Sequence, residues 1–506
     1  MTIQLWISSF LNMISNPQVL MYLLFGVMAG AMIGALPGLS STMGIAILTP
    51  LTFWLDADCG FAMLIGVWNS SVWAGGISAI IINTPGTPGS VASSFDGYKL
   101  YKKGQGGLAL GVNVIYSALG GLMSTVALIF FAWPLARFAV TFGPSEYFAL
   151  ALFGLSMMVS VSGNSVLKGM AVGLAGLLLS TVGMDPITAS ARYTFGITYF
   201  QSGIQFLPVM IGMFGIGEVL MQIYDYNREQ VARENELKKD NMALGRVLPN
   251  KEEVRQLAVP TFLAGIASII IGIIPAAGGD IASIICWGQG KNLSRHGKEY
   301  GEGSLEGMAV STISNNGVLG GALITMLTMG IPGDSVTAIL IGSLMMYGMT
   351  PGVKMFNEQP GFIVNIMLLM IFANIIISVL GLLTAKASAK VLNVKAQSVW
   401  VAVAVLCVVG SYALNNSFYD VLLMFFAAIL GFLFKKADFP PGPFILGLLL
   451  GNMLESNFRR ALILSGGSLS IFYTRPVTAV LLLIIILTLL FPVLKRHFLK
   501  MRVKAA

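Results

Sequence analysis

The chain has 506 residues, of which 56% are hydrophobic and only 10% are charged, and its mean hydropathy is +0.82. Soluble domains carry roughly 25% charged residues, so this composition excludes an ordinary water-soluble protein and indicates a polytopic membrane protein. The net charge is +8, but the basic residues lie in short loops and in the tail. That distribution follows the positive-inside rule of membrane proteins and does not indicate a nucleic-acid-binding surface.

Hydrophobic runs long enough to cross a bilayer recur along the whole chain. They lie at residues 19–35, 61–82, 108–136, 146–161, 166–182 and 206–223 in the first half, and at 258–274, 308–329, 362–383, 399–414, 421–434, 444–453 and 471–494 in the second. A crossing helix needs about 20 apolar residues and several runs are shorter, so the pattern predicts about 11–13 transmembrane helices. The expected fold class is an all-α polytopic membrane protein.

A long polar stretch at residues 224–256 separates the two hydrophobic halves. It carries acidic and basic side chains in equal number, and we interpret it as a charged cytoplasmic linker with some helix. We therefore divide the chain into a first transmembrane repeat at residues 1–223, the linker, and a second transmembrane repeat at residues 257–506.

The two halves contain three similar short patterns in the same order. "GALPGLSSTMGIAIL" in the first half resembles "GIIPAAGGDIASIIC" in the second, "NSSVWAGG" resembles "SNNGVLGG", and "NTPGTPGSVA" resembles "MGIPGDSVTA". The separation between the members of each pair is nearly constant along the chain. This regularity indicates an internal repeat, which is common in secondary transporters.

Loop charges predict how the two repeats are oriented. The loop after the first pattern is acidic in the first half, with Asp56 and Asp58, but basic in the second half, at residues 291–298. The loop after the third pattern is basic in the first half, at residues 99–103, whereas its counterpart holds Lys354 beside an acidic residue. Because basic loops stay in the cytoplasm, we predict that the repeats have inverted topology.

Each repeat also contains two proline-glycine breaks, at residues 37–38 and 85–89 and again at 275–279 and 332–333. Backbone that is not helical exists at membrane depth only where protein buries it or where it lines a wet cavity. Each break is followed by residues suited to begin a helix, namely Ser40 to Thr42, Ser90, Asp280, and Asp334 with Ser335. We therefore predict two discontinuous or re-entrant half-helix motifs in each repeat.

Half-helices that begin near the midplane present free N–H groups and a positive dipole end, which together bind an anion without Lys or Arg. We predict a substrate-binding site at the breaks and at the segments that face them. Its candidate residues are Pro37, Gly38, Asn69, Ser70, Ser71, Thr84, Gly86, Thr87, Ser90, Asn315, Asn316, Gly330, Gly333 and Ser335. Asp280 and Asp334 are candidate ligands for sodium or carriers of a coupled proton, because a carboxylate at membrane depth is costly and therefore a functional candidate.

Structural roles remain open for several of these residues. A single proline-glycine pair can be a kink, and the glycine pairs at Gly75 and Gly320 can serve close helix packing. Asn315 and Asn316 can form hydrogen bonds between helices, and Asp334 can act only as an N-cap. An enzyme is not expected and no catalytic residue is predicted, because the only histidines are His296 in a loop and His497 in the tail.

The same motifs carry a family resemblance. "GALPGLSSTMGIAILTPLTF", "NTPGTPGSVASSFDGYKLYKKGQGG" and "YGEGSLEGMAVSTISNNGVLGGALITMLTMGIPGDSVTAILIGSLMMYGMTPG" resemble the large membrane subunit of the tripartite tricarboxylate transporters, the TctA family. On this resemblance the signature loops of the family fall on residues 37–38, 83–92, 315–316 and 330–336. The motifs run in order through both halves of the chain.

The resemblance implies a secondary transporter of the bacterial inner membrane that takes up citrate-like di- or tricarboxylates. It implies two protein partners, a small four-helix membrane subunit and a periplasmic substrate-binding protein, and a sodium or proton gradient as the driving force, with no cofactor. A stand-alone carboxylate symporter is the alternative. The chain departs from the family pattern at Ser311 and Thr312, where a Pro-Glu pair is common, and at Thr325, where proline is common. Substrate and coupling ion therefore transfer less readily than the fold.

Overall fold

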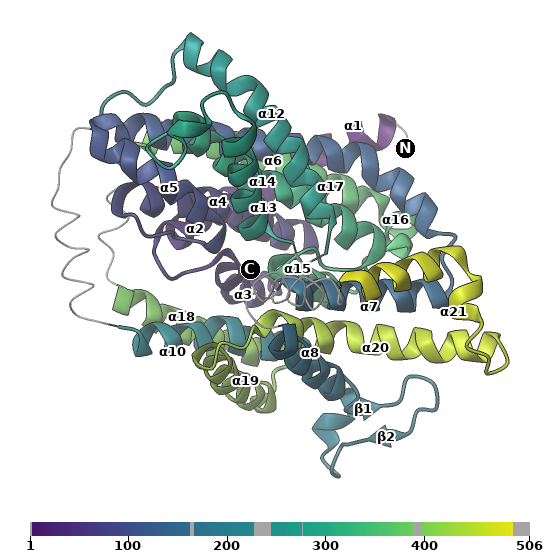
Figure 1. Cartoon of the computed structure of the whole chain (residues 1–506). Coiled ribbons are helices and arrows are strands. Elements are labelled where there is room, and N and C mark those ends of the chain that lie inside the picture. The colour runs from purple at the N-terminus through teal and green to yellow at the C-terminus, as the bar shows by residue number, and fades with distance from the viewer. Residues whose placement is uncertain (1–2, 162–165, 227–243, 276, 388–395, 489–506) are drawn as a thin grey trace, which may run out of the picture.

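The structure, a computed structural model, describes residues 3–161, 166–226, 244–275, 277–387 and 396–488. It consists almost wholly of α-helices, which confirms the predicted all-α class. Two short strands, β1 (Gly183–Met184) and β2 (Ala191–Arg192), pair antiparallel in a small hairpin that projects from the lower side in Figure 1. Much of the predicted linker, residues 227–243, and one position of the third break, residue 276, lie outside the described residues.

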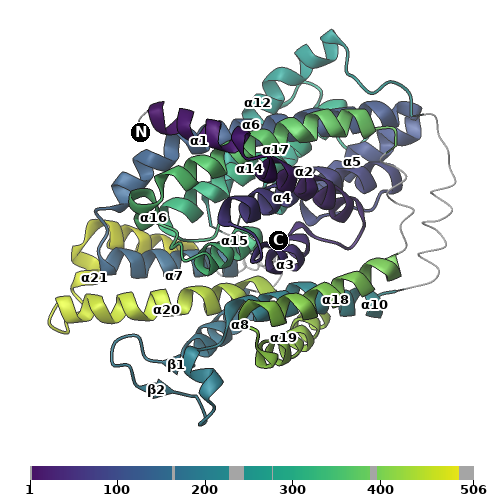
Figure 2. The same ribbon diagram turned by 180° about the vertical axis from the view of Figure 1, so that it is seen from behind.

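The helices form two layers, which we call the upper and lower bodies after their places in Figures 1 and 2. The upper body contains α1 (Ile3–Ser15), α2 (Pro17–Ala35), α4 (Ala57–Ile82), α5 (Val91–Leu100), α6 (Gly106–Ala139), α12 (Lys251–Ile273), α13 (Gly279–Leu293), α14 (Leu305–Met329), α16 (Val353–Glu358) and α17 (Pro360–Thr384). The lower body contains α7 (Pro144–Val161), α8 (Val166–Ser180), α9 (Phe206–Ile211), α10 (Gly217–Tyr224), α18 (Ala396–Asn415), α19 (Phe418–Lys436), α20 (Pro441–Leu464) and α21 (Ile471–Thr474). Both halves of the chain contribute helices to both bodies.

Two short helices, α3 (Ser41–Thr52) and α15 (Ser335–Met346), lie between the bodies. Helix α3 packs against α2 and α4 above and against α9 and α18 below. Helix α15 packs against α14 above and against α9 and α20 below. These two half-helices therefore connect the layers, and each begins at one of the proline-glycine breaks.

Eight of the described helices are long and apolar enough to cross a membrane, and four shorter apolar helices, α3 and α15 among them, accompany them. Helix α14 is not one of the eight, because Asn315, Asn316 and several hydroxyl side chains lower its hydropathy. Outward faces of the spans are apolar, as Val401, Val405 and Val409 of α18 show: each is at least half exposed and they recur at one-turn spacing. Such a stripe suits contact with lipid.

The two halves use the same order of elements, α2–α3–α4–α5–α6 in the first and α12–α13–α14–α15–α17 in the second. Packing between the halves is reciprocal. Helix α6 of the first half packs on α14 of the second, and α17 of the second packs on α4 of the first. In the same way α3 packs on α15, and α13 packs on α5 and on the short 3-10 turn η1 (Pro88–Ser90) that precedes it.

Glycines allow the helices beside the breaks to pack closely against one another. Along α2, Gly26, Gly30 and Gly34 face α4, and a Cβ atom at any of them would lie only 2.1–2.2 Å from an α4 oxygen. A spacing of four residues places them on one face of the helix, as in other small-residue helix interfaces. Gly75 and Gly320 likewise lie against Thr87 and Ser124, at 2.3 and 2.1 Å from the position of a Cβ atom. Close packing is therefore a role that both glycine pairs fill.

The four half-helices run in two directions away from a shared centre. The C-terminal ends of α3 and α15 meet, where the Tyr347 hydroxyl donates to the carbonyl oxygen of Thr52 at 2.5 Å. The C-terminal parts of α5 and α13 meet elsewhere, through Asp96, whose carboxylate accepts from the Trp287 indole at 2.8 Å and from the backbone of Gly301 at 2.8 Å. One helix of each pair comes from each half of the chain.

Candidate functional site

The first-half breaks have the geometry that their residues dictate. After α2 the chain turns through Gly38, whose φ of +87° is in the left-handed region that favours glycine. Ser40 then caps α3, its hydroxyl oxygen accepting from the backbone N–H of Met43 at 3.1 Å. After α4 the chain passes through Asn83, with φ of 54°, and Thr87 precedes η1 and α5. Ser90 closes that turn by donating to the carbonyl oxygen of Thr87 at 2.7 Å.

The second-half breaks begin α13 and α15. Gly278, with φ of +22°, is the N-cap of α13, and Asp280 lies in the first turn of that helix. Gly330 ends α14 in the left-handed conformation. Asp334 caps α15: its Oδ1 accepts from the backbone N–H and from the hydroxyl of Thr337, both at 2.7 Å. The N-cap role of Asp334, left open by the sequence, is therefore one that it fills.

All four half-helix starts line one cavity of about 340 Å³, which we call the central cavity. Its polar lining consists of hydroxyls from the first half (Ser40, Ser41, Thr42 and Thr87), and of Asp280, Asp334, Ser335 and Asn315 from the second. Trp68, Val72 and Leu319 supply apolar wall. None of the described residues that line it is Lys, Arg or His. Each helix N-terminus at this cavity contributes about half a positive charge.

Asn315 joins the two halves at the wall of the central cavity. Its Oδ1 lies 2.1 Å from where a Cβ atom would stand on Gly89 of η1, and 2.5 Å from the corresponding position on Gly279 of α13. Its Nδ2 donates to the carbonyl oxygen of Val72 at 3.5 Å. Only glycines at 89 and 279 leave room for this amide between the starts of two half-helices.

Thr87 contributes a buried hydroxyl group to the wall of the central cavity. The residue is 5% exposed, and its Oγ1 has no hydrogen-bond partner among the described residues. An unsatisfied buried polar group costs about 1–3 kcal/mol. A ligand or water in the cavity would remove that cost, which makes Thr87 a candidate contact.

Sequence comparison decides the family. The chain matches the tripartite tricarboxylate transporter TctA family over residues 20–446. It belongs to that family. One relative, an uncharacterised 52.8 kDa protein in the TAR-I ttuC' 3' region of Agrobacterium vitis, is 34% identical over 92% of this chain and 91% of its own length. Another, an uncharacterised protein in the TAR-II ttuC' 3' region of the same organism, is 32% identical over 42% of this chain and 88% of its own length. No solved structure matches the chain.

The match confirms the family resemblance and makes this chain a multi-pass membrane transporter of the TctA family. Two of the family departures contact other helices: the Ser311 hydroxyl lies 3.3 Å from that of Ser93, and the Thr312 hydroxyl donates to Asn113 at 3.4 Å. The third, Thr325, bonds back to the carbonyl oxygen of Ala322 at 3.1 Å. None of the three is among the residues that line the central cavity.

Several predicted site residues of this TctA-family chain lie away from the central cavity, inside helix contacts. The Oδ1 of Asn69 accepts from Asn374 of α17 at 3.1 Å, and the Nδ2 of Asn316 donates to the Ser117 hydroxyl of α6 at 3.0 Å. Ser70 and Ser71 donate to carbonyl oxygens of their own helix, at 2.8 and 3.0 Å. Pro37, Thr84, Ser90, Gly330 and Gly333 shape the breaks but do not line the cavity. The predicted residues that do line it are Thr87, Asn315, Ser335, Asp280 and Asp334.

A second cavity of about 620 Å³, which we call the vestibule, opens beside the first. The two adjoin, since they share the lining residues Ser40, Thr42, Thr87, Pro88, Asp280 and Ser335. The vestibule adds the predicted residues Gly38 and Gly86, and it extends to the lower body at Phe214, Glu218, Lys435 and residues 440–443. It therefore lies where the two bodies meet.

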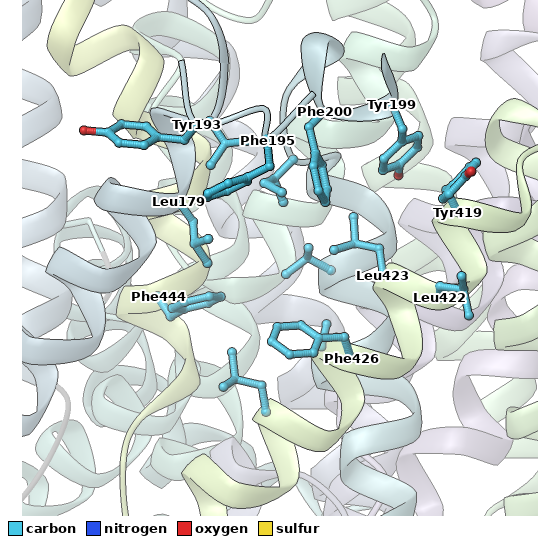
Figure 3. A pocket seen from close by; sticks show the side chains of 15 residues that line it. Leu179, Tyr193, Phe195, Tyr199, Phe200, Tyr419, Leu422, Leu423, Phe426 and Phe444 are labelled. Carbon is cyan, nitrogen blue, oxygen red and sulfur yellow. The ribbon is translucent and has the colours of Figure 1, made fainter. Parts of the chain in front are cut away.

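A third hollow, of about 430 Å³, has the wrong chemistry for a carboxylate. It lies in the lower body, where α8, α9, α19 and α20 meet the segment that carries the hairpin (Figure 3). Phe195, Phe200, Phe426 and Phe444 point into it, and the described residues that line it are all apolar or tyrosine. No charged group is found among these described residues.

Two features of the site were not predicted. Glu218 pairs with Lys435 across α10 and α19 in the vestibule wall, although neither was a predicted site residue. Asp96 is fully buried and accepts from the backbone N–H groups of Gly303 and Ser304 at 3.0 and 2.7 Å. A carboxylate in a segment otherwise bearing only lysines was the available signal, but its partners lie some 200 residues away and no local pattern announces them.

Proposed function

We propose that this chain is the large membrane subunit of a three-component, binding-protein-dependent transporter of the bacterial inner membrane, which uses an ion gradient to take up citrate-like di- or tricarboxylates. The observation that carries the proposal is the central cavity. Four helix starts and five hydroxyl side chains face this one space. Two carboxylates also line it, and none of the described lining residues is basic. Backbone N–H groups at helix N-termini and hydroxyls are suitable donors for a carboxylate.

Asp280 and Asp334 argue for ion coupling. A carboxylate substrate in the same cavity would meet two like charges, and close like charges at membrane depth are strongly unfavourable. A cation or a bound proton at the aspartates removes the conflict, because it offsets their charge and that of the substrate. Sodium and protons both suit carboxylate oxygens. The arrangement thus favours a transporter in which anion and cation bind together.

The reciprocal packing of the two halves supports inverted repeats and alternating access. Each pair of half-helices, α3 with α15 and α5 with α13, takes one member from each half. The pairs extend from the central cavity in different directions, with their C-terminal parts joined through Tyr347 and through Asp96. Inverted repeats around a midplane site produce this arrangement. In our proposal, loops 99–103 and 291–298 both lie in the cytoplasm, in agreement with their basic charge.

The partners in this proposal are a small four-helix membrane subunit and a periplasmic substrate-binding protein. Their support is the family itself, whose name describes a tripartite transporter. A stand-alone sodium- or proton-coupled symporter would use the same central cavity without them. The two functions differ in one measurable property, which is whether uptake needs the binding protein.

The test is uptake into proteoliposomes. The chain is reconstituted alone, with the proposed small membrane subunit, and with both proposed partners. Uptake of radiolabelled citrate, succinate and acetate is measured under a sodium gradient, a proton gradient or neither. We expect gradient-dependent uptake of citrate or succinate only when the binding protein is present. Strong uptake by the chain alone would favour the symporter, and no carboxylate uptake under any condition would reject both.

A further inference from the structure

The wall of the vestibule contains a basic side chain, Lys435. Of the described residues that line the central cavity or the vestibule, Lys435 alone is Lys, Arg or His. It lies near the end of α19, and its ammonium group pairs with the carboxylate of Glu218 on α10. The two side chains are only 24% and 18% exposed. The vestibule, which leads to the proposed anion site, therefore contains a partly buried ammonium group that is paired with a carboxylate of the protein.

This ion pair is unusual in its position. A partly buried ion pair is costly to desolvate and is weak evidence of stabilisation. Stability of the fold therefore does not explain why this pair lies in a cavity wall. The carboxylate of Glu218 and that of an organic acid are chemically equivalent partners for an ammonium group. An arriving substrate can therefore replace Glu218 at Lys435 without leaving the cation unpaired, and lysine, a flexible point charge, can follow either partner.

We propose that Lys435 binds a carboxylate group of the substrate in the vestibule and that Glu218 holds Lys435 when substrate is absent. The inference rests on the proposed function and adds to it a charge exchange beside the central cavity. The vestibule wall also contains Thr87 and Ser335. A substrate with two or more carboxylates can thus contact a half-helix start with one group and Lys435 with another, whereas a monocarboxylate cannot make both contacts.

The neighbouring lysine supplies a matched control. Lys436 follows Lys435 in the chain, but its ammonium group lies over the Tyr224 ring, 4.6 Å from the ring centre, and it does not line the vestibule. Replacing Lys436 removes the same charge from the same end of α19. An effect restricted to Lys435 is therefore an effect of the vestibule and not of the net charge of this region.

The experiment measures KM and maximal rate for K435Q, K435R, E218Q, the double variant K435Q/E218Q and K436Q, in the complete system that supports wild-type uptake. The probe is whichever of citrate and succinate the wild type transports, with acetate binding, measured by competition, as the monocarboxylate comparison. We expect K435Q to raise KM about 10-fold or more, since it removes a charge-assisted contact, and K435R to retain most of the affinity. E218Q, which frees Lys435, should lower KM and slow turnover, and K436Q should match wild type.

The double variant separates binding from a structural role, because it contains no unpaired charge and its fold is not at risk from one. We expect it to show the raised KM of K435Q, with a smaller change for acetate than for the multivalent substrate. A merely structural ion pair predicts that both single variants lose function together and that the double variant recovers. That result, or a wild-type KM in K435Q, would overturn the inference while leaving the transport function intact. Absence of all carboxylate uptake in wild type would instead overturn the proposed function, and the inference with it.

Discussion

The first half of the chain lines the central cavity with uncharged groups only, whereas the second half brings both carboxylates. Ser40, Ser41, Thr42 and Thr87 come from the first half, and Asp280 and Asp334 from the second. The backbone plan is shared, since each half places two helix starts at the cavity. Each half therefore supplies two helix starts, with their positive ends, to the same cavity. In our proposal the hydroxyl-lined wall suits the anion and the wall with the carboxylates suits the cation.

The largest effect on transport should come from neutralising Asp280 or Asp334, the two carboxylates of the central cavity. D334N keeps an oxygen that can cap α15, so the helix should remain while the cation partner is lost. We expect ion-driven uptake to fall about 100-fold in D334N and in D280N, because a contact to a charged group is worth about 1.5–3 kcal/mol and 1.4 kcal/mol is tenfold. Uptake with and without the ion gradient measures this.

D58N is the matched control, since Asp58 lies at the start of α4 and accepts from Asn365 at 2.9 Å, away from the cavity. It should transport normally. Normal gradient-driven uptake in both D334N and D280N would show that the asymmetry of charge has no part in coupling.

The next largest effect is expected from a variant that disturbs the close contact between the two halves at Asn315. G89A would place a methyl group 2.1 Å from the Oδ1 of Asn315, so the amide must move out of the wall that it shares with the second half. Overpacking of this kind costs about 1–3 kcal/mol, and we expect uptake to fall by about 10-fold or more. G288A on α13, where nothing lies within 4 Å of the added carbon, is the control. Equal uptake in the two variants would contradict the role given to Asn315.

A smaller effect should follow from the first-half hydroxyl. T87V removes an oxygen that has no partner among the described residues, so the fold should not suffer. We expect KM to rise about 3- to 10-fold with little change in melting temperature, because a neutral hydrogen bond contributes about 0.5–1.5 kcal/mol. T337V in the second half should do the reverse, lowering the melting temperature through the lost contact with Asp334. A T87V variant that only loses stability would place Thr87 outside the binding surface.

The smallest effect on transport is expected at the hairpin of the lower body, which serves as a remote reference. Hydrogen bonds from the backbone of Thr188 and from Arg459 hold the pKa of Asp185 below its ordinary value. A lowered pKa means that its stabilisation is present above the unfolded-state pKa, about 3.9, and is lost as pH falls below it. D185N should therefore lower the melting temperature at pH 7, with the difference from wild type shrinking towards pH 3, while KM stays unchanged. A changed KM would link the hairpin to the site.

Asn69 and Asn315 show why the site could be predicted only in part. They occupy corresponding patterns in the two halves, and both were predicted to bind substrate. In the structure Asn315 lines the central cavity, whereas Asn69 bonds Asn374. Helix α4 is buried on every side, so it has no polar face that could indicate which side meets the cavity. Asn316 was likewise predicted to bind substrate, but it donates to Ser117 although it is the next residue after Asn315.

The sequence by itself determined the membrane class, the family and the four breaks with their helix starts, because composition, spacing, proline and glycine act locally on the backbone. Only the tertiary structure decided which side chains share a space. Asp280 and Thr87 lie almost 200 residues apart in the chain yet face the same cavity, and Glu218 and Lys435 meet across two helices. Such neighbours depend on how helices from both halves pack, and packing is set by long-range contacts that no short stretch of sequence records.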